Sequence, residues 1–178
     1  MQSIQVRALR DVGDREIQQL SDVLIDCVEG GASVSFMLPI ARSTAIAFWK
    51  EAAAGVARGE RILLAAADLT GSIVGTVQII FAQAPNQPHR ADVAKMLVHR
   101  RARRHGVGAA LLTAAETAAL DAGKTLLVLD TASGDAERLY ARLGWQRCGV
   151  VPDYALLPGG GFCDTTFFYR KLSQPERL

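Results

Sequence analysis

The stretch Arg103-Arg104-His105-Gly106-Val107-Gly108 decides the fold, because it joins a predicted strand at 89–98 to a predicted helix at 106–122. Glycine lets backbone amides approach a ligand closely, and the amides at the start of a helix bind anions. Arginine adds bidentate donors for phosphate oxygens. The stretch therefore predicts a loop that binds a pyrophosphate. The simpler alternative is a turn at a solvated corner.

Outward from this loop, hydrophobic periodicity predicts the order strand, helix, helix, three strands, helix, strand, helix, strand, strand. We expect strands at 3–9, 61–69, 72–83, 89–98, 125–130, 145–151 and 165–172, and helices that begin near Asp14, Ser43, Gly106 and Asp135. The strand at 125–130 is almost continuously apolar, which is typical of a central strand covered on both faces. The third helix is expected to bury Val107, Ala110, Leu111, Ala114, Ala118 and Leu120. This order predicts a mixed α+β fold with helices on both faces of one sheet.

The composition is that of one folded domain. The chain has 178 residues, of which 49% are hydrophobic and 21% are charged. No linker or repeat divides it, so we expect a single domain over 1–172 and a flexible tail over 173–178. No apolar run approaches the roughly 20 residues that cross a bilayer, and no export signal precedes the first strand. These features favour a cytoplasmic protein without membrane contacts.

The three cysteines and the net charge exclude several classes of function. Cys27, Cys148 and Cys163 are odd in number and widely spaced, so neither a disulfide framework nor a metal site is expected. A net charge of +2 supplies no field that would recruit nucleic acid. The arginines before Gly106 are a small, isolated cluster without interleaved aromatic residues, which also argues against nucleic acid.

Two ligands remain for the glycine loop. A dinucleotide fold also joins a strand to a helix through Gly-x-Gly and has an acid about 20 residues on, where Asp130 lies. That fold needs a tight turn, however, and Leu111 occupies its third glycine position. Coenzyme A, with a pyrophosphate and a ribose phosphate, suits the mixture of amides and arginines better.

The sequence resembles the GCN5-related N-acetyltransferase (GNAT) family over nearly its whole length. Arg103-x-x-Gly106-x-Gly108 matches the acetyl-CoA signature of that family. The segment from Ala136 to Trp145, which contains Tyr140, resembles the family's later helix and turn, although Ser133 stands where the family often has Asn. The resemblance implies a GNAT fold, whose twisted sheet of six to seven strands is mostly antiparallel.

Further matches are similar to the tabtoxin-resistance acetyltransferases within this family. They comprise Gly30-Gly31-Ala32-Ser33-Val34 with Phe36-Met37, Pro85-Asn86 with Arg90-Ala91, and Leu129-Asp130-Thr131 with Gly134 and Ala136-Glu137. Most of them lie outside the coenzyme signature. They imply a shared acceptor side of the pocket without establishing the same acceptor.

The resemblance implies that acetyl-CoA is the co-substrate and that no metal takes part. The residues expected to hold it are Met96, Leu97, Val98, Arg103, Arg104, His105, Gly106, Val107, Gly108, Ala109, Thr131, Ser133 and Tyr140. In the family, the strand before the glycine loop bends outward, so the pantetheine arm would pair along it. An amide of Met96 or Leu97 would then face the thioester carbonyl as negative charge develops on its oxygen.

Three residues are candidates for proton transfer. Tyr140 is expected to protonate the departing thiolate, because a phenol stays neutral at pH values where a thiol begins to ionise. Asp130, at the end of a strand, and Asp92, eleven residues before Arg103, compete for the role of base, and we place Asp130 slightly ahead. An unassisted reaction, in which the amine arrives neutral, stays open.

The acceptor is expected to be a small amine, such as a toxin or antibiotic of the tabtoxinine-β-lactam type. Its apolar wall would consist of Val34, Phe36 and Met37, and a cation would be attracted by Asp92, Asp130 and Asp153. The amine would attack directly, through a tetrahedral intermediate. The alternatives are an NAD(P)-dependent reductase that uses the Gly106-x-Gly108 loop and an acyl-CoA sensor without turnover. The apolar strand 165–169 and the hydrophobic hairpin are compatible with a homodimer.

Overall fold

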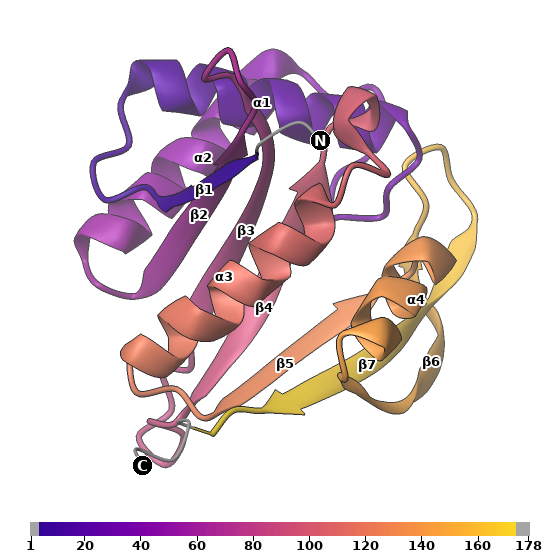
Figure 1. Cartoon of the computed structure of the whole chain (residues 1–178). Coiled ribbons are helices and arrows are strands. Elements are labelled where there is room, and N and C mark those ends of the chain that lie inside the picture. Colours follow the sequence, from indigo (N-terminus) through magenta and orange to yellow (C-terminus); the bar gives the residue numbers. More distant parts are fainter. Residues whose placement is uncertain (1–3, 174–178) are drawn as a thin grey trace.

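One seven-stranded sheet with helices on both faces organises the molecule in the computed structural model, which describes residues 4–173 (Figure 1). The sheet order is β1-β2-β3-β4-β5-β7-β6, and only the β4–β5 pair is parallel. The strands are β1 (Gln5–Ala8), β2 (Arg61–Ala67), β3 (Ile73–Phe81), β4 (Arg90–Val98), β5 (Leu126–Thr131), β6 (Gln146–Leu156) and β7 (Phe162–Lys171). The predicted mixed fold with a mostly antiparallel sheet is confirmed. The tail predicted at 173–178 lies, apart from Ser173, outside the described residues.

Two pairs of helices cover the sheet. Helices α1 (Asp14–Glu29) and α2 (Arg42–Ala57) bury Leu24 and Trp49 against one face, which includes Leu63 and Leu97. Helices α3 (Val107–Asp121) and α4 (Gly134–Arg142) cover the other face (Figure 1). A 3-10 helix, η1 (Arg100–Ala102), follows β4 directly. None of these helices is long and apolar enough to span a membrane, in the part of the chain that the structure describes.

Strands β4 and β5 diverge in the middle of the sheet. Their pairing covers only Arg90–Asp92 and Leu126–Val128, after which β4 continues to Val98 without β5 as a neighbour (Figure 1). On its other edge, β4 has a bulge opposite β3, and Lys95 lies in it with a φ of 50°. A bulge adds one unpaired residue and increases the local twist, which turns β4 away from β5. After Asp92, the edge of β4 that faces β5 therefore has backbone amide and carbonyl groups without a neighbouring strand.

The predicted coverage of β5 is wrong. β5 is fully covered on one face only: Leu127 and Leu129 are buried, whereas on the opposite face Leu126 and Val128 are partly buried and Asp130 is exposed, because α1 and α2 pack mainly on β2, β3 and β4. The first two helices begin at Asp14 and Arg42, within one residue of the predicted starts, and their N-caps are Gly13 and Ala41.

Candidate active site

The start of α3 has the features of an anion site. Gly106, with a φ of 79°, is the N-cap, and no heavy atom lies within 4 Å of the position that a Cβ would take. The amide of Ala110 donates to the Gly106 carbonyl at 3.0 Å. The amides of Val107, Gly108 and Ala109 therefore have no acceptor within the helix. Together with the positive end of the helix dipole, these amides suit a pyrophosphate.

Helix α4 lies close to the start of α3. A Cβ on Gly108 would lie 3.1 Å from Leu139 Cδ2, so the absence of a side chain allows the two helices to approach. Leu139 precedes Tyr140 in α4. The start of α3 is thereby packed against the helix that contains the predicted catalytic tyrosine.

The basic cluster before α3 divides into two pairs of arginines. Arg100 binds Asp26, through Nε at 2.9 Å and through its backbone amide at 2.7 Å, and Arg101 lies 3.7 Å from Asp68. In contrast, neither Arg103 nor Arg104 forms an ion pair with any described carboxylate. Arg103 donates to the Val98 carbonyl at 3.3 Å. Only this second pair is free to neutralise a bound anion.

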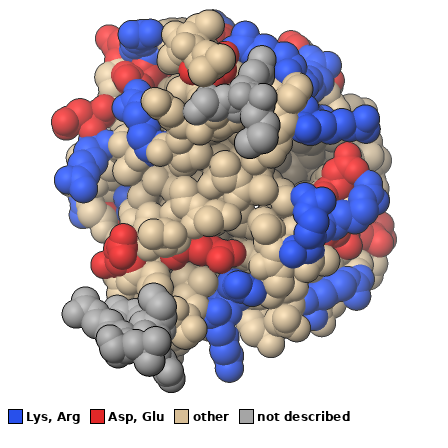
Figure 2. Space-filling view, in the orientation of Figure 1, with Lys and Arg blue, Asp and Glu red and all other residues tan. Residues whose placement is uncertain are grey.

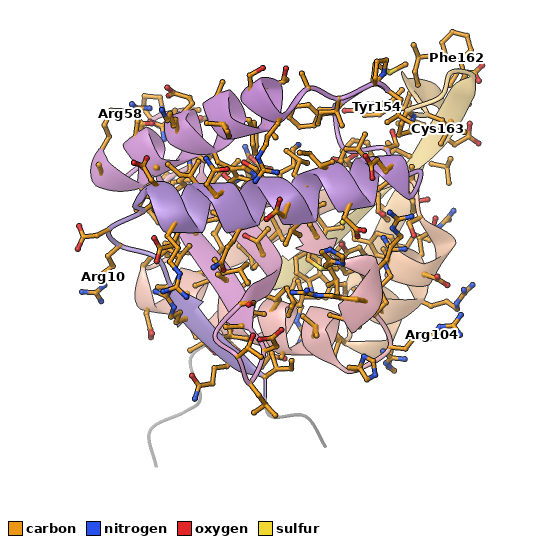
Figure 3. The ribbon with its side chains drawn as sticks, turned by 90° about the horizontal axis from the view of Figure 1, so that it is seen from above. Arg10, Arg58, Arg104, Tyr154, Phe162 and Cys163 are labelled. Carbon is orange, nitrogen blue, oxygen red and sulfur yellow. The ribbon has the colours of Figure 1, made fainter. Side chains whose placement is uncertain are left out.

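Arg104 has a φ of 64° and projects from the edge of the molecule in Figure 3. His105 beside it is also exposed. Figure 2 shows basic and acidic side chains interspersed over one face, with basic groups at the upper right, near the segment that precedes α3. The local charge for an anion therefore comes from particular arginines and not from a broad positive surface.

Tyr140 is both a core aromatic and a candidate acid. It is 4% exposed, and its ring packs 5.9 Å from Trp145 and 5.6 Å from Phe168. No described residue forms a hydrogen bond with its hydroxyl. Burial, helped by the negative charge of Asp130, raises the pKa of Tyr140 well above its ordinary value. The phenol is therefore protonated at every ordinary assay pH.

The two candidate bases differ in their surroundings. Asp130 accepts a hydrogen bond of 2.9 Å from the neutral hydroxyl of Thr165, and its charge acts on the pKa of Tyr140. Asp92 lies at the last position at which β4 pairs with β5, and it forms an ion pair of 2.6 Å with Arg90. The structure thus brings Asp130, and not Asp92, into electrostatic contact with Tyr140.

The predicted acceptor wall is only partly a free surface. Val34 and Phe36 are half-buried against the core under α1 and α2, with the Phe36 ring 5.4 Å from that of Phe48, whereas Met37 is 46% exposed. Asp153 is exposed within β6, and its amide donates to the Asp164 carboxylate at 3.0 Å. The segment 152–156, expected to be loop, extends β6 beyond a second register shift.

The link between α1 and α2 is fastened to the β6–β7 hairpin. Ser33 Oγ donates to the Leu156 carbonyl at 3.1 Å, and the Leu38 amide donates to the Pro158 carbonyl at 2.9 Å. Figure 3 shows Tyr154, Phe162 and Cys163 of this hairpin at one corner of the molecule. The segment that contains Val34, Phe36 and Met37 is therefore in contact with the hairpin that contains Asp153.

Four of the described residues other than glycine have a left-handed backbone conformation, and two of them, Ser35 and Lys95, are joined by a hydrogen bond. Within residues 4–173, the non-glycine residues with positive φ are Ser35, Lys95, Arg104 and Asp153. They come from the α1–α2 link, the β4 bulge, the glycine loop and β6. Left-handed conformations cost free energy and are retained mostly at functional sites. Lys95 was given no role by the sequence, since its conformation and neighbours depend on the bulge.

Thr131 and Ser133 have local partners. The Ser133 hydroxyl accepts from the Ala136 amide and caps α4, while Thr131 Oγ1 accepts from the Ser133 amide at 3.1 Å. Both residues thereby shape the turn between β5 and α4. No three His, Cys, Asp or Glu side chains among the described residues are grouped so that they could hold a metal ion.

Comparison with known families identifies the chain. Residues 34–145, more than half of the sequence, match the model of the acetyltransferase (GNAT) family. The chain belongs to the GNAT acetyltransferase family. It is accordingly an N-acetyltransferase. The reductase alternative does not fit this family or an antiparallel sheet.

Solved structures share this GNAT fold at low sequence identity. A candidate acetyltransferase from Salmonella typhimurium, solved with its cofactor acetyl-CoA, is 18% identical with a TM-score of 0.76, and the match covers 98% of this chain and 96% of that one. A candidate phosphinothricin N-acetyltransferase is 19% identical with a TM-score of 0.78, over 97% and 100% of the two chains. The ribosomal-protein-alanine N-acetyltransferase from Brucella melitensis is 20% identical with a TM-score of 0.75, over 94% and 99%. Because the names of the last two indicate different acceptors, the fold alone does not identify the acceptor.

Proposed function

We propose that this protein transfers the acetyl group of acetyl-CoA to the amine of a small molecule. The observation that carries the proposal is the electrostatic contact between Asp130 and Tyr140. Asp130 lies beyond the last position at which β5 pairs with β4, and Tyr140 lies in the helix that packs against the start of α3. The exposed carboxylate can accept a proton from the amine, and the protonated phenol can donate a proton to the departing sulfur.

The residues present fit acetyl-CoA. The free amides of 107–109 and the guanidinium groups of Arg103 and Arg104 would hold the pyrophosphate. The backbone of β4 that lacks a neighbour after Asp92 offers donors and acceptors to the pantetheine amides, as an added strand would. The bound thioester supplies an activated acetyl group at the point of divergence.

Of the two amides expected to face the thioester carbonyl, the sheet register favours Met96. The His99 amide donates to the Val74 carbonyl of β3 at 2.9 Å. Because amides alternate in direction along an antiparallel strand, the Leu97 amide is also directed to β3. The Met96 amide then lies on the β5 side and would stabilise the negative oxygen of the tetrahedral intermediate.

In this proposal, the amine nitrogen first forms a bond to the acetyl carbon, which gives the tetrahedral intermediate, and the carbon–sulfur bond then breaks as this intermediate collapses. Asp130 accepts a proton from the attacking amine, directly or through water, while Thr165 orients its carboxylate. Tyr140 donates its proton to the departing sulfur, and the proton from the amine restores the phenol through solvent. The hydrogen bond from Ser33 to the Leu156 carbonyl holds the α1–α2 link against the β6–β7 hairpin, which would limit the acceptor to a small molecule.

The test is thiol release from acetyl-CoA in the presence of a panel of amines. The panel contains tabtoxinine-β-lactam and phosphinothricin, because the sequence resembles tabtoxin-resistance enzymes and a structural neighbour carries the second name. It also contains aminoglycosides, polyamines, amino acids and a lysine-containing peptide. Turnover with a small amine supports the proposal, turnover with the peptide alone contradicts it, and coenzyme binding without turnover indicates an acyl-CoA sensor.

A further inference from the structure

Lys95 places a cation near the α1–α2 link, which contains the predicted acceptor wall. Its ammonium donates to Ser35 Oγ at 3.2 Å and lies 5.6 Å from the centre of the Phe48 ring. Ser35 belongs to the α1–α2 link and Phe48 to α2, so the side chain extends from β4 toward the acceptor segments. Among the described residues, no carboxylate lies within 4.0 Å of this ammonium.

The backbone at both ends of this hydrogen bond is held in an unfavourable conformation. Lys95 has a φ of 50° and Ser35 a φ of 77°, and neither is glycine. A bulge redirects a side chain, and strain of this kind is retained where a particular side-chain position is needed. The pair is therefore positioned by the fold and is not a chance contact of two flexible side chains.

A partly buried ammonium without a counter-ion has lost some of its hydration, so the binding of an anion beside it would stabilise it. Burial lowers the pKa of Lys95, and the charge of Asp130 opposes that shift. Asp130 is thus near enough to act on Lys95 electrostatically, yet it does not form an ion pair with it. Lys95 and Asp130 therefore supply one positive and one negative charge within electrostatic range of each other.

We propose that Lys95 and Ser35 form a subsite for an anionic group of the acceptor, which would be a carboxylate in an amino acid. The acceptor would then carry its amine toward Asp130 and its carboxylate toward Lys95. This inference rests on the proposed acetyl transfer and narrows its substrate class to zwitterionic amines. Lys95 is a specificity residue in this account and takes no part in proton transfer.

The experiment compares matched acceptors. L-Lysine, L-methionine, L-serine and phosphinothricin are each paired with the primary amide of their carboxylate, which removes one negative charge and little else. Binding to the coenzyme A-saturated protein is measured by calorimetry, and turnover is measured by thiol release. For at least one pair, we expect the carboxylate member to be favoured about 10-fold or more in kcat/KM, the scale of one charge-assisted hydrogen bond.

Two substitutions at Lys95 keep the test independent of folding. Lys95→Met removes the charge at similar length, and Lys95→Gly removes it while relieving the left-handed backbone. Both should abolish the preference within the pair, mainly through the KM of the acceptor, and Lys95→Met, which changes only the side chain, should leave the KM for acetyl-CoA unchanged. Lys95→Arg should retain part of the preference. Lys50→Met, at an exposed lysine of α2, is the matched control and should change nothing.

The outcomes separate the two proposals. Turnover without preference within the pairs, or a preference that survives in both charge-removing variants, overturns the subsite and leaves acetyl transfer intact. Carboxylate-dependent binding that Lys95→Met abolishes, without any thiol release, supports the subsite and overturns acetyl transfer. Neither binding nor release with any probe contradicts both.

Discussion

The carboxylate of Asp130 on β5 accepts a hydrogen bond of 2.9 Å from the hydroxyl of Thr165 on β7. Thr165 is 3% exposed, so the bond holds the carboxylate in one orientation without neutralising its charge. Asp92, by contrast, lies 2.6 Å from the guanidinium of Arg90. The Asp92 carboxylate is already engaged by a guanidinium, whereas Asp130 has only a neutral hydrogen-bond donor, so these contacts favour Asp130 in the role of base.

Asp130→Asn should lower kcat/KM by about 100-fold or more, the usual contribution of a general base. The amide oxygen of Asn can still accept from Thr165, so we expect the melting temperature to change little. The measurement is steady-state thiol release with the accepted amine.

Asp92→Asn serves as the comparison, because it removes the other candidate base and an ion pair that is partly exposed. We expect a change in kcat/KM of less than about fivefold, since such pairs contribute little. Equal losses in the two variants would contradict the assignment of the base to Asp130.

Tyr140→Phe should lower kcat by about 100-fold, because the variant keeps the ring but cannot protonate the leaving thiolate. Since the pKa of Tyr140 is raised, the wild-type rate should show no loss from phenol ionisation between pH 6 and 9.5. The check is a pH–rate profile of both proteins. An unchanged kcat in the variant would leave Tyr140 with only its packing role.

Tyr140 should also make stability depend on pH in alkaline solution. In the unfolded chain a phenol ionises near pH 10, whereas the folded state holds the proton to higher pH. The stabilisation is therefore complete below about pH 10 and is lost as the pH rises toward the folded pKa. Thermal unfolding between pH 9 and 11 should show a steeper decline in the wild type than in Tyr140→Phe. Parallel declines would contradict the raised pKa.

Arg104→Ala should raise the KM for acetyl-CoA by about 10-fold, as expected for the loss of one charged phosphate contact. Arg101→Ala is the matched control from the same basic cluster, because Arg101 already lies near the Asp68 carboxylate. Its KM should stay within about twofold of the wild-type value. If both variants weaken coenzyme binding equally, the division of the arginines into two pairs has no functional meaning.

Gly106→Ala should destabilise the fold by about 1–2 kcal/mol, since an alanine at a φ of 79° is strained even though space for its Cβ exists. Coenzyme affinity should fall as well, because the strain is relieved by moving the amides of the loop. Gly149→Ala is the control: it lies in β6 without a positive φ and also has space for a Cβ. Urea denaturation that gives the same stability for both variants would contradict the role of this conformation.

Several structural details were beyond reach of the sequence. In α3, the predicted buried stripe contained Ala110, Ala114 and Ala118, whereas the structure buries Leu112, Ala115 and Ala119. Almost every residue of this helix is small or apolar, so periodicity cannot identify the buried face. The partly exposed face of β5 was missed for a related reason, because an apolar run does not reveal which strands α1 and α2 cover.

The order of helices and strands was determined by the sequence alone, because periodicity and turn residues are local. Short motifs are local too, so the sequence also indicated the loop at Gly106 as a candidate anion site and Asp92, Asp130 and Tyr140 as candidates for proton transfer. The choice among the candidates required the tertiary structure. Whether a carboxylate is neutralised, an arginine is free or a lysine lacks a counter-ion depends on residues far away in the chain, such as Thr165 for Asp130, Asp26 for Arg100 and Ser35 for Lys95. Charge and burial are properties of these contacts, and only folding creates them.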